Sequence, residues 1–137
     1  MERPMQTISF TIPGKPFAWR RARSHGKIRF KDKATEAHEA TLQAIALQHF
    51  PVPLEGPVKL TVRAVFKIPV SWSKKKAAAL FGRPHTQKPD LSNLIKHVED
   101  GLNRIAWVDD GQIAKYGESE KVWGDKDEMI VWVEPQS

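Results

Sequence analysis

Alternating apolar and polar residues mark two stretches of the chain as β-strands. Residues 7–12 place every second side chain on one apolar side of an extended chain, and Pro13-Gly14 ends the stretch. The alternation over residues 58–66 is longer and unbroken. Two further strands are predicted in the last quarter of the sequence, near residues 113–123 and 129–133.

Three other stretches indicate helices. Residues 34–49 are rich in Ala, Glu, Gln and Leu, and Pro51 stops them. Ser73 is a predicted N-cap for a short helix that runs through Leu80. The strongest helical stripe follows, with apolar residues at Leu91, Leu94, Ile95, Val98, Leu102 and Ile105.

Residues 15–33 are basic and aromatic without a clear period, which favours a loop or an irregular hairpin. The predicted elements follow the order β-α-β-α-α-β-β, with neither repeats nor a long linker between them. This order predicts an α+β fold with a mixed sheet, formed as a single domain over residues 1–137.

Composition narrows the class of protein. The chain has no cysteine, which excludes disulfides and thiolate zinc sites. No apolar run reaches the roughly 18 to 20 residues that span a bilayer, and the first residues lack the layout of a secretory signal. We therefore expect a soluble, cytoplasmic protein with no membrane partner. A zinc enzyme is not favoured either, because ligand spacing is missing among His25, His38, His49, His85 and His97.

Charge is distributed unevenly along the chain, whose net charge is +6. Residues 1–34 carry a balance of +7 and residues 35–87 a balance of +4, whereas residues 88–137 carry −5. A basic region joined to an acidic one suggests a polyanion binder in which a cation separates carboxylates from phosphate. The ordinary alternative is a solvated basic surface with a charge-balancing tail.

Acidic side chains gather between residues 88 and 112. Asp90 stands where the helix with the strong stripe begins, and Asp109-Asp110 follow one short turn beyond its end. If the chain reverses so that these carboxylates meet, they repel one another and need a cation to stay ionised. Oxygen ligands without a His or Cys cluster favour Mg²⁺ or Mn²⁺. The metal-site hypothesis thus depends on Asp90 lying close to Asp109 and Asp110.

Each of these signals has a purely structural alternative. Asp90 is a common type of N-cap residue, and Asp-Asp-Gly is an ordinary turn sequence. Lys96 on an exposed helix face is usually solvated. It is their grouping inside an otherwise basic protein that favours a functional site.

These residues resemble the pattern of the RusA-like Holliday junction resolvases of bacteria and their phages. In this chain the matching segments read Lys88-Pro89-Asp90-Leu91-Ser92-Asn93-Leu94-Ile95-Lys96, then Asp100-Gly101-Leu102-Asn103 and Trp107-Val108-Asp109-Asp110-Gly111-Gln112. The family's basic N-terminal segment is similar to Gly14-Lys15-Pro16 and Arg20-Arg21-Ala22-Arg23. The resemblance spans most of the chain. It implies a Mg²⁺-dependent endodeoxyribonuclease, with no small-molecule cofactor, that resolves four-way DNA junctions in recombination and repair.

The resemblance also implies roles for individual residues. Asp90, Lys96 and Asp110 would be catalytic, and Asp90, Asp109 and Asp110 would hold Mg²⁺ or Mn²⁺. The ion would polarise the scissile phosphate, while Lys96 would stabilise the developing charge or orient the attacking water.

Ser92 departs from the family pattern, which has a second aspartate at this position. Serine reaches a metal only weakly or through a water, so one ligand is lost. Three explanations stay open: natural variation compensated by Glu99 or Asp100, a deliberately inactivated sequence, or a naturally weak nuclease. We favour the first, while a junction-binding protein without catalysis is the alternative function.

Basic side chains are expected to neutralise DNA phosphates around the cut, with largely sequence-independent affinity. The predicted DNA-binding residues are Arg20, Arg21, Arg23, Lys27, Lys74, Lys75, Lys76 and Lys88. For the three consecutive lysines, a solvated first helical turn is the alternative. Phe17 and Trp19 could stack at a junction or pack in the core. A junction has two-fold symmetry, so two nicks call for a homodimer.

Restriction-type nucleases form the other rival class. They need an Asp or Glu two residues before a Lys on a strand, and we find no such triplet in the sequence.

Overall fold

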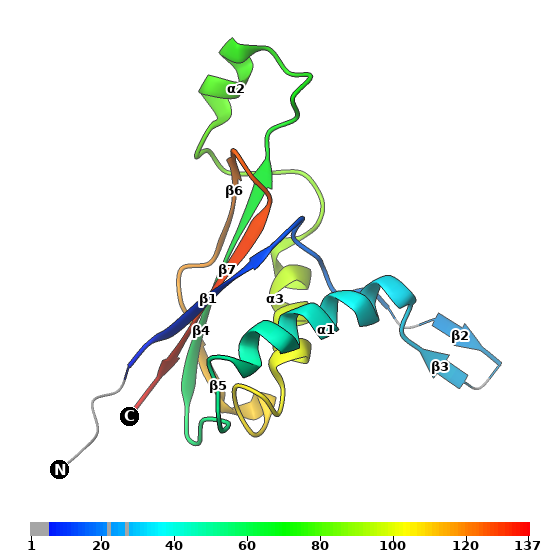
Figure 1. Cartoon of the computed structure of the whole chain (residues 1–137), viewed down its shortest axis with the longest axis vertical. Helices are drawn as coiled ribbons and strands as arrows, with labels where there is room; N and C mark the ends of the chain where they lie inside the picture. The colour runs from blue at the N-terminus through cyan, green and yellow to red at the C-terminus, as the bar shows by residue number, and fades with distance from the viewer. Residues whose placement is uncertain (1–5, 22, 27) are drawn as a thin grey trace.

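The computed structural model describes residues 6–21, 23–26 and 28–137 (Figure 1). In chain order the elements are β1 (Ile8–Pro13), β2 (Arg23–His25), β3 (Ile28–Phe30), α1 (Lys33–Leu47), β4 (Val58–Lys67), α2 (Lys74–Leu80), α3 (Leu91–Leu102), the 3₁₀ turn η1 (Asp110–Gln112), β5 (Ile113–Tyr116), β6 (Glu120–Gly124) and β7 (Glu128–Pro135). The predicted α+β class is confirmed.

One mixed five-stranded sheet organises the fold. Its order is β1-β7-β4-β5, with β6 pairing to β4 beyond β5. β7 is antiparallel to both β1 and β4, whereas β5 and β6 run parallel to β4. β4 is therefore bonded along both of its edges, which agrees with its nearly continuous burial.

Helices α1 and α3 cross on one face of the sheet, where a single core forms (Figure 1). The apolar stripe of α3 supplies Leu94, Val98 and Leu102, which are fully buried. The two helices approach closely at Gly101, because a Cβ there would meet Leu42 Cδ2 at 2.4 Å. A helix-interior glycine costs roughly 1 kcal/mol in propensity, and here it makes room for α1.

One detail differs from the sequence prediction, whereas a hairpin, one of the two possibilities expected for residues 15–33, is present. The single strand expected over residues 113–123 is divided into β5 and β6. The break begins at Gly117, where a Cβ would lie 1.9 Å from Thr61 Oγ1 of β4, so no side chain fits. Residues 15–33 include the hairpin β2–β3, which projects away from the sheet (Figure 1).

The hairpin β2–β3 and the arm that carries α2 project away from the sheet (Figure 1). No helix in the described part of the chain is both long enough and apolar enough to pass through a membrane.

Candidate active site

The start of α3 carries one exposed carboxylate among cations. Asp90 is the N-cap residue by backbone geometry, yet its side chain makes no capping hydrogen bond. Instead Lys88 Nζ donates to Asp90 Oδ1 at 2.7 Å. This bond, with the charge of Lys88 and a weaker contribution from Lys121, lowers the pKa of Asp90. The capping explanation for Asp90 therefore does not account for its carboxylate, which stays ionised beside a lysine.

Lys121 of β6 fixes the loop that leads into α3. Its Nζ donates to the carbonyl oxygens of Gln87 at 2.6 Å and Pro89 at 2.7 Å. These two carbonyls flank Lys88, and hydrogen bonds from a charged donor are among the stronger ones in proteins. The sheet thus sets the position of Lys88 and Asp90.

The end of α3 gathers four acidic or phenolic groups. Trp107, whose side chain is fully buried, donates from Nε1 to Asp110 Oδ1 at 2.8 Å and so orients that carboxylate. Asp110 acts electrostatically on Glu99 and Asp100 of the last helical turn. Tyr116 of β5 donates a short hydrogen bond to Glu99 Oε1.

Carboxylates at this end oppose one another's ionisation. Partial burial raises the pKa of Glu99, and the charges of Asp110 and Asp100 raise it further. The pKa of Asp100 is raised by the same two causes, burial and then Asp110. The hydrogen bond to Glu99 raises the pKa of Tyr116 to about 12, so its hydroxyl stays a donor at neutral pH. Positive charge brought to this end would relieve the repulsion.

Asp109 has a structural role in the turn. Its Oδ2 accepts from the backbone N–H of Gly111 at 2.9 Å, and Gln112 completes a reciprocal capping box around η1. Gln112 Nε2 also donates to the carbonyl oxygens of Leu54 and Gly56, which ties the turn to the chain before β4. The turn interpretation of this sequence thus applies to Asp109, while Asp110 beside it faces α3.

Lys96 lies between the two ends of α3. Its Nζ is 3.6 Å from the centroid of the Trp19 ring, a cation–π contact. Trp19 in turn donates its backbone N–H to the Asn93 carbonyl at 2.8 Å. Lys96 also lowers the pKa of Glu99 and of Asp100, so its charge reaches the acidic end. The basic N-terminal segment therefore packs along α3 and holds the predicted catalytic lysine.

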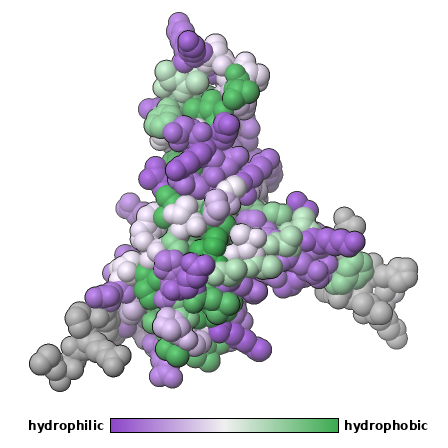
Figure 2. Space-filling view, in the orientation of Figure 1, coloured by the Kyte–Doolittle hydropathy of each residue, from purple (hydrophilic) through white to green (hydrophobic). Residues whose placement is uncertain are grey.

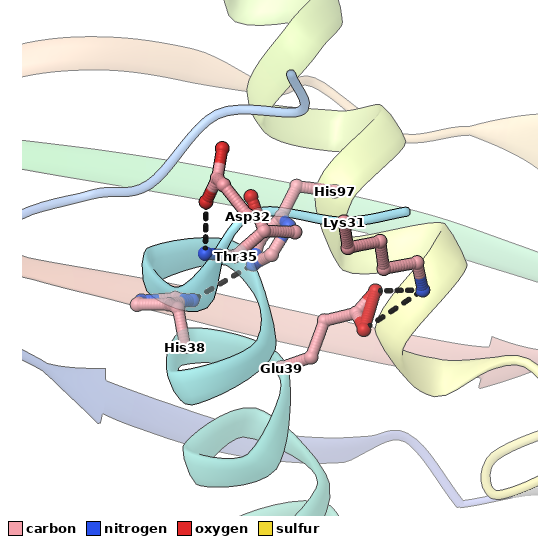
Figure 3. A network of polar contacts seen from close by, with 6 residues as sticks. All are labelled: Lys31, Asp32, Thr35, His38, Glu39 and His97. Carbon is pink, nitrogen blue, oxygen red and sulfur yellow. Dashed lines mark hydrogen bonds and ion pairs between the residues drawn. The ribbon is translucent and has the colours of Figure 1, made fainter. Parts of the chain in front are cut away.

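A polar network joins this segment to both helices (Figure 3). His38 Nδ1 and His97 Nε2 are 2.8 Å apart and link α1 to α3, and Phe17 stacks on the His38 ring. His97 is buried, and desolvation together with the charge of His38 lowers its pKa to about 4. Asp32 caps α1 by accepting from the backbone N–H of Thr35. The residues drawn are Lys31, Asp32, Thr35, His38, Glu39 and His97.

The predicted metal ligands are not brought together in this arrangement. A rise of 1.5 Å per residue puts about 15 Å of helix between the levels of Asp90 and Asp100. Asp110 begins η1, which follows the end of α3 along the chain, and its charge acts on Asp100 near the end of the helix. Within the ranges that the structure describes, no three His, Asp or Glu side chains lie close enough to hold a metal ion. The roles of Asp90, Asp109 and Asp110 as ligands stay predictions.

Donor chemistry at the end of α3 nevertheless fits a hard divalent cation. Asp110, Glu99 and Asp100 offer only oxygen atoms, and partial burial together with repulsion from neighbouring carboxylates raises the pKa of Glu99 and of Asp100. Magnesium is usually held by one or two carboxylates, with waters and substrate phosphates completing its shell. Glu99 and Asp100, expected from the sequence only as substitutes for Ser92, are the carboxylates that Asp110 meets.

The predicted DNA-binding residues fall in three places. Lys88 is at the start of α3, and Lys74, Lys75 and Lys76 are exposed in the first turn of α2. Arg20 and Arg21 are exposed beside α1, where Arg20 pairs with Asp32 at 3.6 Å. Arg23 belongs to β2, where the structure describes only its backbone, and Lys27 lies outside the described residues.

Sequence reasoning missed Lys121 and Tyr116, and it did not connect Trp19 with Lys96. Lys121 contacts backbone carbonyls 32 and 34 residues away, and Tyr116 reaches Glu99 across 17 residues. Neither contact leaves a local pattern. Exposed polar side chains on a strand that follows an acidic turn were the available signal.

Comparison with known proteins gives two findings. The model of the family "Endodeoxyribonuclease RusA" matches residues 13–134. A relative in Bacillus subtilis (strain 168), "Uncharacterized protein YqaN", is 37% identical over 119 residues, which cover 80% of this chain and 83% of that protein.

Proposed function

The chain belongs to the RusA endodeoxyribonuclease family, and from this premise we propose that it cuts phosphodiester bonds at four-way DNA junctions in recombination and repair. One observation carries the proposal: the charge of Asp110 acts on Glu99 and Asp100 in the last turn of α3, and these two residues follow Lys96 by three and four positions on the helix. Carboxylates that could hold a cation, together with a neighbouring lysine, are groups that could catalyse the hydrolysis of a phosphodiester.

We propose Mg²⁺ as the cation, with Mn²⁺ as a substitute. Asp110 would hold it together with Glu99 or Asp100, and the DNA phosphate would complete the set of oxygen ligands. When bound, the ion would supply a Lewis acid for the scissile phosphate. Trp107 keeps the Asp110 carboxylate oriented from the buried side.

Asp90 would join that ion through a rearrangement of the start of α3 when DNA binds. From its present place it holds the ammonium of Lys88, which is highly exposed. An oriented lysine at this position would bind a phosphate next to the cut.

Lys96 would act on the phosphate from the middle of the helix. In water its ammonium is mobile, whereas the Trp19 ring and the neighbouring acids confine it here. A confined cation can meet the charge that builds on the phosphoryl oxygens without reorganising at the moment of reaction.

We further propose a homodimer that acts in the cytoplasm. A four-way junction has two-fold symmetry, and two copies related by such an axis would present two active sites to two like strands. Paired nicks would then follow from one binding event.

The decisive experiment uses labelled four-way, forked and linear DNA with and without Mg²⁺. We expect paired nicks in the four-way junction with Mg²⁺ and none without it. Equal cutting of linear duplex would contradict the structure specificity. Tight junction binding with no cutting in either Mg²⁺ or Mn²⁺ would support the alternative.

That alternative, a junction-binding protein with little or no catalysis, is favoured by two observations. Ser92 stands in place of an acidic residue, and three carboxylates do not form a closed metal site within the described residues. Calorimetric titration of Mg²⁺ into the free protein and into its junction complex separates the two: the enzyme should bind the ion more tightly when DNA supplies a ligand.

A further inference from the structure

The arm between β4 and α3 exposes apolar side chains without a partner in the described structure. Residues 68–83 project beyond the end of the sheet and carry α2 (Figure 1). Val70 is 88% exposed and Phe81 is 60% exposed. They border a cavity of about 470 Å³ whose other lining residues include Trp72, Ala77 and Ala78. Figure 2 shows apolar side chains on this arm bordered by hydrophilic ones.

The floor of this cavity is firmly built. Trp72 packs on the buried Trp123 of β6, with ring centroids 5.1 Å apart. Ser73 caps α2 by accepting from the backbone N–H of Lys76 at 3.1 Å. An aromatic floor below exposed aliphatic walls suits a flat, apolar group.

The rim of the cavity is basic. Lys74, Lys75 and Lys76 form the first turn of α2, which has no acidic residue. Lys76 Nζ lies 3.9 Å from the centroid of the Trp72 ring. Asp125 is the acidic residue among those lining the cavity. The combination is complementary to a ligand that carries both a flat apolar group and negative charge.

The arm is held next to the start of α3. Residues 82–85 pair with β6 through Gly82 N–H to Trp123 O, Trp123 N–H to Arg83 O, and His85 N–H to Lys121 O. The same Lys121 fixes the loop that carries Lys88 and Asp90. DNA engaged along α3 would therefore meet the arm at one side of the cut.

We propose that this arm binds branched DNA at its branch point: Lys76 leaves the Trp72 ring and joins Lys74 and Lys75 on backbone phosphates, and one unstacked base takes its place in the cavity over Trp72. Bases at a branch are more easily unstacked than bases within a duplex, and base–aromatic stacking tolerates any sequence. Recognition by the cavity would thus select the branch rather than a sequence. The inference rests on the proposed function for its DNA partner and deepens it by naming what distinguishes a junction from a duplex.

The test measures binding without Mg²⁺, so that cutting plays no part. Fluorescence anisotropy compares a four-way junction with a linear duplex for Val70→Ser and Phe81→Ser. We expect each change to weaken junction binding roughly ten-fold and duplex binding by less than about two-fold. Matched controls are Val52→Ser and Leu47→Ser, which replace side chains of similar exposure, 71% and 60%, away from the arm.

Two further experiments distinguish contacts with the base from contacts with the phosphates. Lys74→Gln and Lys75→Gln should weaken both DNAs and reduce the slope of log affinity against log salt by about one for each lysine. 2-Aminopurine at the branch should be quenched by the wild type and not by Trp72→Leu. Equal losses on junction and duplex for Phe81→Ser, or no loss on either, would overturn the cavity proposal. So would loss of dimers in sedimentation with unchanged DNA binding, which would make this face a contact between two copies.

These outcomes are distinct from a failure of the proposed nuclease. If the wild type binds junctions through the arm but never nicks them with Mg²⁺, the arm proposal stands and the enzyme proposal fails. If the Phe81→Ser variant nicks junctions as specifically as the wild type does, the enzyme proposal stands and the arm proposal fails.

Discussion

The two ends of α3 carry the same kind of side chain in opposite electrostatic settings. At the start, Asp90 meets Lys88 and Lys121, and its pKa is lowered. At the end, Glu99 and Asp100 meet Asp110, and their pKa values are raised. Carboxylates alone therefore do not mark a metal site. At the end, Lys96 only partly offsets burial and the repulsion between carboxylates, so this is the end that a cation from solution would stabilise.

The largest effect is expected from Asp110→Asn, which keeps the acceptor for Trp107 but removes the charge at the end of α3. Nicking should fall about 100-fold or more, because loss of a group that only orients a metal ligand already costs roughly 10- to 100-fold. Junction affinity should stay within a few-fold. Asp109→Asn is the matched control, because asparagine also caps a turn. If the two variants lose the same activity, the distinction drawn between these neighbours is wrong.

Lys96→Gln tests the middle of the helix. Losing a preorganised positive charge near the phosphate should lower kcat by on the order of 100-fold with little change in KM. Trp19→Ala should free the ammonium, and acetylation of Lys96, followed by mass spectrometry, should become faster than in the wild type. Unchanged acetylation would mean that the indole does not confine this lysine.

The buried His97 makes the free energy of unfolding of the protein depend on pH. Its pKa falls from 6.5 to about 4 on folding, so the unfolded chain binds more protons between these values. Stability from this residue is complete above pH 6.5 and declines as pH falls toward 4, by about 3 kcal/mol at most. Urea unfolding of wild type and His97→Gln should show a smaller loss between pH 7 and 4.5 for the variant. Parallel curves would contradict this.

Lys121→Met should act on the start of α3 and leave its end intact. Two charge-assisted hydrogen bonds to the loop are lost, and we expect nicking to fall about ten-fold. Affinity for Mg²⁺ should be unchanged, because Asp110 and its neighbours are untouched. Lys126→Met, on the neighbouring β6–β7 turn, is the control for loss of charge.

The smallest effect is expected from Ser92→Asp, which restores the family pattern. An added carboxylate on the exposed first turn should hold activity or raise it a few-fold if a ligand is merely missing. Nicking assays at several Mg²⁺ concentrations measure this. A large loss would show that the serine has its own role.

The sequence was informative wherever a local pattern decides the structure. The alternation over residues 58–66 and the stripe from Leu91 to Leu102 predicted β4 and α3, because periodicity reports which side is buried. Ser73 was correctly predicted as an N-cap. For Asp90 the helix boundary was right, whereas the use of its side chain depends on Lys88 and was not predictable from capping rules.

Which carboxylates lie near one another was harder to predict from the sequence, because this depends on the length of the helix and on where the chain turns back after it. The sequence gives the separation of Asp90 from Asp110 but not the direction of α3 relative to β5. In the structure the charge of Asp110 acts on Glu99 and Asp100 in the last helical turn. Contacts such as that of Tyr116 with Glu99 need the sheet register as well.

The break between β5 and β6 at Gly117 separates the two strand residues that contact the two ends of α3. Tyr116 on β5 serves the end and Lys121 on β6 serves the start, and both strands lie along β4 with the tight step at Gly117 between them. The distance between the two ends of α3 therefore has to match the distance between Tyr116 and Lys121 along the edge of β4. An insertion of one residue after Gly117 would shift Lys121 relative to Tyr116, so that both contacts with α3 could no longer form together, while the core would stay intact.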